Sequence, residues 1–340
     1  MKKLFGLLTT LVMIFGLLGF SGCGKSTTAD LSGVKDLLAF IPENATGVFT
    51  INLKKITRMD VFKEQLEKSQ TEPGMKEKEF FHNYQEFIEK TGVDPEKDID
   101  TMVIAMFKSF NMKMDSNKGV AGIISLNYDK DKVLNFIKEK TGEYTVESHG
   151  DQTIYNFTSS KNNTVSLSFL NNKFITFGEN AYVKGIIDLK QKGGKSLLDN
   201  VKLKPYINEI QSGKVIHFVF GFPKELKESQ PQGTPFKVDL SKAETLVGFI
   251  DHENQAWSGE IKLISPDEES NKQIVNLLNG LKGMAALAGP EVSELVSNIN
   301  LTSSVEDIKL TFSLTDELLK KLQAKAKEKA SGFMQQSEFE

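Results

Sequence analysis

The sequence predicts an α+β fold, with helices packed on mainly antiparallel β-sheet. Two observations carry this prediction: short stretches of alternating apolar and polar residues follow one another across turn residues, and amphipathic helical stretches fall between them without regular strand–helix alternation. Composition agrees, since 39% of the 340 residues are hydrophobic and 26% are charged, as in a globular body. With one cysteine the fold holds without internal disulfides.

In the first part of the chain, strands and helices are punctuated by helix caps and glycines. The segment 101–107 is apolar on both faces, which indicates a central strand. Asp129 or Asp131 starts a helix that closes at Thr141-Gly142, and Asn180 caps another that ends at Gly193-Gly194. The expected strands are 49–53, 101–107, 120–128, 144–147, 153–157, 165–169 and 174–177; the expected helices are 61–90, 129–141, 180–192 and, in pieces around Pro205, 197–210.

The later part repeats this alternation. The segment 215–222 is strongly strand-like, and His217 lies on its lighter face as a structural histidine. Segments 246–250 and 257–264 form a long hairpin, and Ser265-Pro266-Asp267-Glu268 starts a helix. The remaining expected elements are a short helix after Pro290, a hairpin of 301–305 with 308–314 around Glu306-Asp307, and a last helix capped by Thr315-Asp316-Glu317.

A weak internal repeat suggests two related halves. Residues 120–157 and 258–314 each run strand, helix, hairpin. Pro231, Gly233 and Pro235 mark the boundary. The predicted organisation is a signal peptide at 1–22, a flexible tether at 23–35, α+β halves at 36–230 and 231–325, and a polar tail at 326–340.

The N-terminus carries the most specific signal in the chain. Lys2 and Lys3 precede the apolar run 4–20, and Ser21-Gly22 provides the small residues required before signal-peptide cleavage. Cys23 comes next, so the segment resembles the lipobox of bacterial lipoproteins, with Phe20 where leucine is usual. The resemblance implies that Cys23 becomes an S-diacylglyceryl, N-acylated cysteine, carrying chains such as palmitate, and holds the protein on a membrane.

The membrane anchor sets the expected location. No second apolar run approaches the roughly 18 residues of a membrane span, so lipid is the expected anchor. Gly24, rather than aspartate, follows the cysteine; by resemblance to lipoprotein sorting we expect the outer membrane, facing the periplasm, over the inner membrane.

The same letters also fit a phosphate loop. Gly19, Gly24, Lys25 and Ser26 satisfy G-x-x-x-x-G-K-[ST]. Cleavage before Cys23 would remove Gly19 and the strand such a loop needs, so the lipobox is favoured. A nucleotide-binding protein using residues 19–26 remains the remote alternative.

The rest of the chain shows no catalytic constellation. The four histidines lack partners at metal-ligand spacing. We expect Asp251-His252-Glu253 to form part of a solvent-facing turn rather than a metal site, Asp129-Lys130-Asp131 to cap a helix, and the acidic segment 94–100 to be a solvated connection. The sequence thus predicts no catalytic, cofactor or metal residues and no enzyme activity; lipidation of Cys23 is its one predicted site.

Partners follow from charge and anchor. The formal net charge is −3 and Arg58 is the one arginine, which argues against a nucleic-acid partner. The chain resembles uncharacterised secreted and lipid-anchored bacterial proteins of unknown function, on the basis of residues 40–48 and 305–322. The expected function is a non-enzymatic binding or scaffolding role with another envelope protein. The alternative is a carrier of lipid or another apolar ligand, held in an apolar groove between sheet and helices; most of the 24 phenylalanines are expected in the core.

Overall fold

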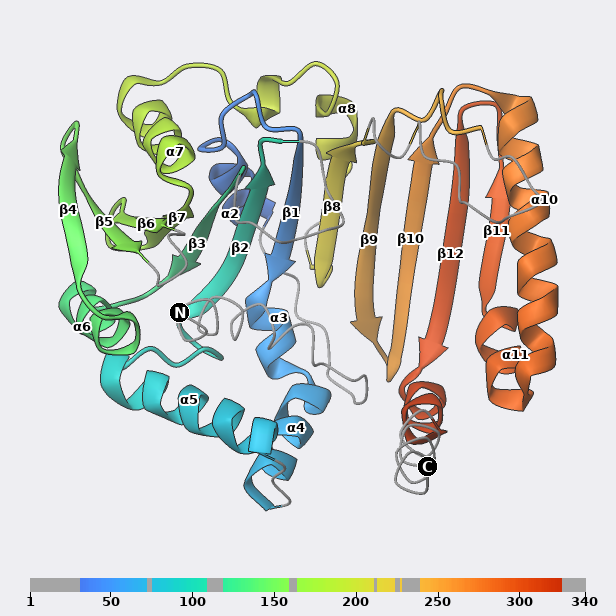
Figure 1. Cartoon of the computed structure of the whole chain (residues 1–340), viewed down its shortest axis with the longest axis horizontal. Coiled ribbons are helices and arrows are strands. Elements are labelled where there is room, and N and C mark those ends of the chain that lie inside the picture. The colour runs from blue at the N-terminus through green and yellow to red at the C-terminus, as the bar shows by residue number, and fades with distance from the viewer. Residues whose placement is uncertain are drawn as a thin grey trace, which may run out of the picture.

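One antiparallel sheet runs through the whole structure (Figure 1). The computed structural model describes residues 31–71, 75–108, 119–158, 164–210, 213–223, 227 and 239–325. Twelve strands follow the order β11-β12-β10-β9-β8-β1-β2-β3-β7-β6-β5-β4, and every pair is antiparallel. The predicted α+β fold is confirmed.

The elements have the following bounds. The strands are β1 Gly47–Asn52, β2 Ile99–Met106, β3 Val120–Leu126, β4 Tyr144–His149, β5 Gln152–Thr158, β6 Thr164–Phe169, β7 Phe174–Gly178, β8 Ile216–Gly221, β9 Thr245–Glu253, β10 Ala256–Ile264, β11 Ile299–Ser303 and β12 Asp307–Thr315. The helices are α2 Leu31–Leu38, α3 Leu53–Arg58, α4 Asp60–Thr71, α5 Met75–Thr91, α6 Lys130–Thr141, α7 Asn180–Lys192, η1 Leu197–Asp199, α8 Lys204–Ile207, α10 Glu268–Ala285, η2 Ala286–Ala288 and α11 Pro290–Ser297. A C-terminal helix follows β12 directly from residue 316.

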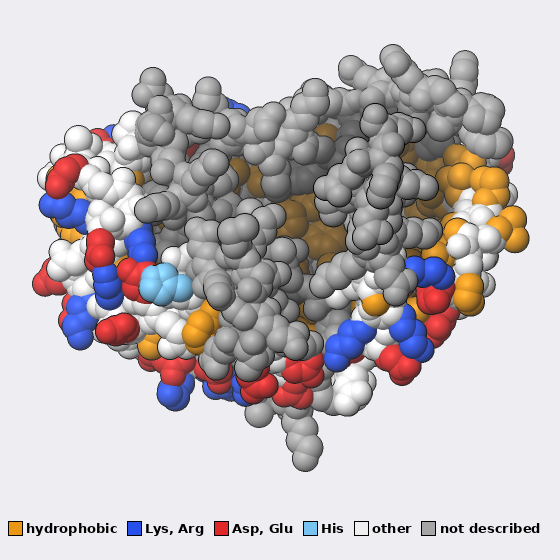
Figure 2. All heavy atoms as spheres, turned by 60° about the horizontal axis from the view of Figure 1, so that its bottom comes forward, with side chains coloured by type: hydrophobic (Ala, Val, Ile, Leu, Met, Phe, Trp, Pro, Cys, Tyr) orange, Lys and Arg blue, Asp and Glu red, His pale blue; other side chains and the backbone are white. Residues whose placement is uncertain are grey.

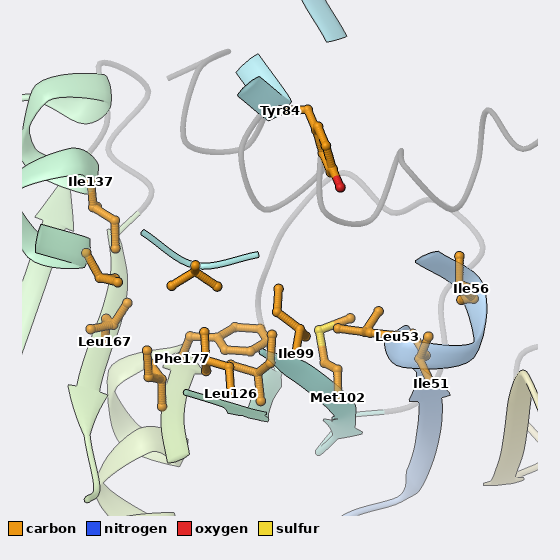
Figure 3. Packing of buried hydrophobic residues seen from close by; sticks show 14 of the residues in the cluster. Ile51, Leu53, Ile56, Tyr84, Ile99, Met102, Leu126, Ile137, Leu167 and Phe177 are labelled. Atoms are coloured by element: carbon orange, nitrogen blue, oxygen red, sulfur yellow. The ribbon is translucent and has the colours of Figure 1, made fainter. Parts of the chain in front are cut away.

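Helices α3 to α6 cover one face of the sheet, which we name the front face. Side chains alternate along each strand, so Ile51 of β1 and Met102 of β2 share this face with Ile124 of β3. Together with Leu53 and Ile56 of α3 they belong to one buried cluster, seen from close by in Figure 3. Residues from α5 and α6 complete it, including Tyr84 and Ile137.

Helices α2, α7 and α8 cover the opposite, back face. Val103 of β2 and Ile123 of β3 are fully buried there beneath Val183 and Ile186 of α7 and Leu37 of α2. Both faces of β1, β2 and β3 are therefore covered, as the apolar character of segment 101–107 predicted.

Helix boundaries differ from the sequence prediction at two places. Helix α2 begins at Leu31, inside the stretch 23–35 predicted as tether, and it docks through Leu37 and Leu38 on the back face. Asn180 is the first residue of α7 rather than its cap, which is Glu179, because the Asn180 side chain donates to Asn156 Oδ1 (3.0 Å) and to Glu147 instead. Asp129 does cap α6, as predicted.

The sheet continues across the predicted boundary between the halves. Strand β8 precedes residue 231 and β9 follows it, and the two pair directly from Ile216↔Ile250 to Gly221↔Thr245. The repeated order is present as β3-α6-β4-β5 and as β10-α10-β11-β12, the second with η2 and α11 inserted. The division into two halves stays a prediction.

Candidate functional site

The front face of β8 to β12 is apolar, whereas the back face of β10 to β12 is mainly polar. Strand register assigns each side chain to one face. Apart from His252 and Ser303, the front face carries Ile216, Phe218, Phe220, Leu246, Gly248, Ile250, Trp257, Gly259, Ile261, Leu263, Ile299, Leu301, Ile308, Leu310, Phe312 and Leu314. The polar side chains of the back face include Ser258, Glu260, Lys262, Asn300, Thr302, Lys309, Thr311 and Ser313.

Phenylalanine rings lie over glycines on this front face. A Cβ added to Gly248 would lie 2.7 Å from Cζ of Phe218 on the neighbouring strand, and one added to Gly259 would lie 2.6 Å from Cζ of Phe312. The glycines let the rings lie close to the backbone, so glycine is required here for packing.

Seven of the front-face residues form a cluster that we name the aromatic groove: Phe49, Met106, Ile216, Phe218, Phe220, Leu246 and Ile261. The Phe49 ring centroid lies 6.1 Å from that of Phe218 and 5.6 Å from that of Phe220. All seven residues come from strands. Four of them are half-buried: Phe49, Ile216, Leu246 and Ile261. Figure 2 shows hydrophobic side chains in a hollow on one face of the molecule.

Helices stand on both sides of the aromatic groove. The cluster of α3 to α6 covers the front face toward β2 and β3. On the other side, Ile274 and Val275 of α10 pack against Ile308 of β12, with Leu263 and Leu301 beside them. The front face therefore has two helical covers with an aromatic strip between them.

On the back face near the end of β9, a buried carboxylate joins three segments. The Asp251 side chain is 1% exposed; Lys55 Nζ of α3 lies 2.6 Å from Oδ1, and Lys214 Nζ, just before β8, lies 3.0 Å from Oδ2. Lys55 also donates to the Gly213 carbonyl oxygen at 2.8 Å. Burial by itself would raise the pKa of Asp251, but hydrogen bonds from both lysines outweigh it and hold the pKa below its ordinary value.

His252 points from the same strand to the opposite face. Its Nε2 lies 3.1 Å from both carboxylate oxygens of Asp316, and its ring centroid lies 4.8 Å from that of Trp257. The Asp316 N–H donates to the Gln255 carbonyl oxygen at 2.9 Å. The β9–β10 turn thus holds the start of the C-terminal helix.

The prediction that Asp251 and His252 belong to a solvent-facing turn is wrong. Strand β9 extends to Glu253 and β10 begins at Ala256, so only Asn254 and Gln255 form the turn, at φ 51° and 60°. Asn254 tolerates positive φ and therefore favours a two-residue turn. A turn that short requires the strands on both sides to reach Glu253 and Ala256, and this was the signal in the sequence for longer strands. Glu253, at the strand end, is exposed as predicted.

The other residues considered from sequence have structural surroundings. His217 is buried in β8 beside Phe249, with ring centroids 5.8 Å apart. Asp94 lies 2.6 Å from Lys97 Nζ and caps its own turn, and Asp129 caps α6. Within the described ranges no group of three or more His, Cys, Asp or Glu side chains is arranged to hold a metal ion.

A second hollow, of about 430 Å³, lies between α7 and the loop before β1. Its lining is mixed, with Pro42, Tyr182, Asp188, Lys192 and Lys195 among its residues. Asp188 is already engaged by Lys192 (2.7 Å) and by His149 (3.0 Å). Because its charged residues have partners within the chain, this hollow offers a weaker site than the aromatic groove.

Cys23 and the phosphate-loop pattern at 19–26 lie outside the described residues. Among the helices that the structure describes, none combines the length and apolarity needed to cross a membrane.

No family model matches the sequence, and no curated protein matches it. Among solved structures, crystal form IV of TP0453 aligns with 84% of this chain and 96% of that chain, at 10% identity and a TM-score of 0.46. Crystal form I of TP0453 aligns with 84% of this chain and 94% of that chain, at 12% identity and a TM-score of 0.45.

Proposed function

We propose that this chain is a bacterial envelope lipoprotein, anchored through Cys23 to the outer membrane, which holds an apolar chain of another envelope component in the aromatic groove without catalysing a reaction. The groove is the observation that carries the proposal. A lipid acyl chain is the ligand chemistry that an uncharged strip of aromatic and aliphatic side chains fits.

The composition of the groove supports an apolar ligand. None of its seven residues has a charged or hydrogen-bonding side chain, so the gain on binding would come from removing apolar surface from water, at about 25 cal/mol per Å². Within the groove, the Phe218 ring lies close to the backbone over Gly248. The predicted tether would place this floor near a membrane, where acyl chains are concentrated.

The polar groups near the groove support a binding role over catalysis. Asp251 is neutralised by two lysines, and His252 is held by Asp316. A general base or nucleophile needs access to substrate. Both groups are buried and engaged in joining segments of the chain, which suits a structural role.

One experiment addresses the anchor and the groove together. Bacterial cells expressing the full chain would be fed a palmitate analogue with an alkyne and a photoactivatable diazirine, and labelled peptides would be mapped by mass spectrometry. Without light, we expect label on the Cys23 peptide in wild type and none there in Cys23→Ala. With light, we expect additional label on peptides of β1, β8, β9 and β10.

Matched variants distinguish binding in the groove from nonspecific labelling of the protein surface. Ile261→Glu places a charge on the groove floor and should lower light-dependent labelling about tenfold, because an unpaired charge is costly in apolar surroundings. Ser313→Glu adds the same charge on the exposed back face and should leave labelling unchanged. Ile261→Trp, which fills the groove without charge, covers the case in which Ile261→Glu fails to fold. Equal labelling in all variants would refute the groove as the binding site.

A further inference from the structure

The C-terminal helix touches three separate parts of the molecule. We name its described residues, 316–325, the strap. It leaves the sheet at the end of β12, and Figure 1 shows it below the sheet between α4 and α11. These two helices belong to opposite sides of the front face, since α4 lies with the cover of β1 to β3 and α11 with α10.

The start of the strap is fixed to the β9–β10 turn. Asp316 pairs with His252, and the Leu318 N–H donates to Thr315 Oγ1 at 3.2 Å. Leu318 is 1% exposed, and Leu319 packs against the cluster that contains Trp257. The strap therefore covers the end of the front face that lies nearest the turn.

Farther along, the strap is tied to both helical covers. Lys320 Nζ lies 3.3 Å from Glu64 of α4, and Lys325 forms an ion pair with Glu291 of α11. Both pairs are partly solvent-exposed, so solvent screens them and each contributes little to stability. These two ion pairs therefore fix where the strap lies but stabilise its position only weakly.

We propose that the strap is an opening closure at the turn end of the front face, over the cluster that shares Ile216 with the aromatic groove; it links the two covers when closed and admits an acyl chain toward the groove when released. The inference rests on the proposed function. Its physical basis is the contrast in attachment. Strand β10 is hydrogen-bonded to β9 and β12 along its length, whereas the described contacts of the strap lie at a few points, which include the His252–Asp316 pair, the Asp316 N–H bond to Gln255, two leucines and two surface ion pairs. Segments with few buried contacts open locally before the rest of a fold does.

A reversible lock tests the closure in the full chain. Glu64→Cys with Lys320→Cys would be joined by a reductant-cleavable bismaleimide in isolated membranes. We expect photolabelling of groove peptides by the palmitate analogue to fall about fivefold on locking, because a closure must open before a chain enters, and to recover on cleavage. Lys54→Cys with Asp100→Cys, another surface ion pair (2.9 Å), is the control lock and should leave labelling unchanged.

The outcomes distinguish the two proposals. Groove labelling that ignores the 64–320 lock would overturn the closure and leave the proposed function intact. Absence of groove labelling in every form would overturn the proposed function. Hydrogen exchange then decides the closure alone: we expect amides of the strap to exchange about tenfold faster than those of β10, and equal protection of the two would overturn it.

Discussion

The two ends of the sheet differ in how their faces are covered. In β2, neighbours Met102 and Val103 point to opposite faces, and both are buried, at 2% and 0% exposure. In β10, neighbours Ile261 and Lys262 also point to opposite faces, but Ile261 is half-buried in the groove and Lys262 pairs with Glu260 on the polar back face. One sheet thus contains a two-sided core and a one-sided platform.

The difference separates stability from binding. A strand covered on both faces contributes to folding through each of its side chains. A strand with one polar, uncovered face contributes less, yet it keeps apolar surface that is only partly removed from water. The region from β1 to β3 is therefore the stable base, whereas the strands β10 to β12, which have one polar back face, keep partly exposed apolar surface on the front face.

The largest expected effect is on the two-sided core. Ile123→Ala removes a fully buried side chain of β3 and should lower the free energy of unfolding by about 4 kcal/mol, through lost burial and the cavity left behind. Urea unfolding followed by circular dichroism measures this. Ile261→Ala in the groove is the matched substitution and should cost about 1 kcal/mol, because its side chain is already partly exposed. Similar losses at both positions would remove the distinction between core and platform.

The next largest effect on the free energy of unfolding is expected at Asp251, whose ion pairs with Lys55 and Lys214 form the junction between the two regions. Asp251→Asn leaves Lys55 and Lys214 without their carboxylate, and breaking a largely buried pair in this way should cost about 3 kcal/mol. Trp257, the one tryptophan, lies in β10 and reports on the platform.

In wild type, we expect Trp257 fluorescence and circular dichroism to show coincident urea transitions. In Asp251→Asn, the fluorescence transition should move to lower urea than the circular dichroism transition, because the platform loses its tie to α3. Lys54→Ala, which breaks an exposed pair on the same helix, is the control and should leave both midpoints nearly unchanged. Coincident transitions in Asp251→Asn would show that the junction does not couple the regions.

The sequence predicted the helices and strands better than it predicted which strands pair in the sheet. Alternation along segments such as 246–250 and 257–264 identified hairpins because partners in a hairpin are adjacent in sequence. The pairing of β1 with both β2 and β8 could not be predicted, since it depends on contacts far apart in the chain. The groove depends on that pairing, because Phe49 reaches Phe218 only when β1 and β8 are neighbours.

The burial of Asp251 and His252 was not predicted from the sequence, for a different reason. Asp251 and His252 are charged or polar residues beside a turn, and such residues are usually exposed. Their burial requires partners from α3, from the segment before β8 and from the strap, which lie 37 to 196 residues away in sequence. Local pattern carries no information on partners at that separation.

The smallest effect concerns a carboxylate on the edge strand β4. Glu147 of β4 accepts hydrogen bonds from Lys184, Asn180 and Asn156, which lower its pKa to about 2. A folded pKa below the unfolded value of 4.5 means that this contribution to stability is complete above pH 4.5 and is lost as pH falls toward 2. Because the side chain is 34% exposed, solvent screening limits the contribution to about 1 kcal/mol.

The pH dependence of unfolding by urea, compared between wild type and Glu147→Gln, measures this contribution. The difference in unfolding free energy should be largest at pH 6 and shrink between about pH 4.5 and pH 2, because protonated Glu147 and glutamine are both neutral. Glu143→Gln, at a side chain that is 83% exposed beside Lys138, serves as control with little difference expected. A constant difference across this range would assign the Glu147 contribution to packing rather than charge.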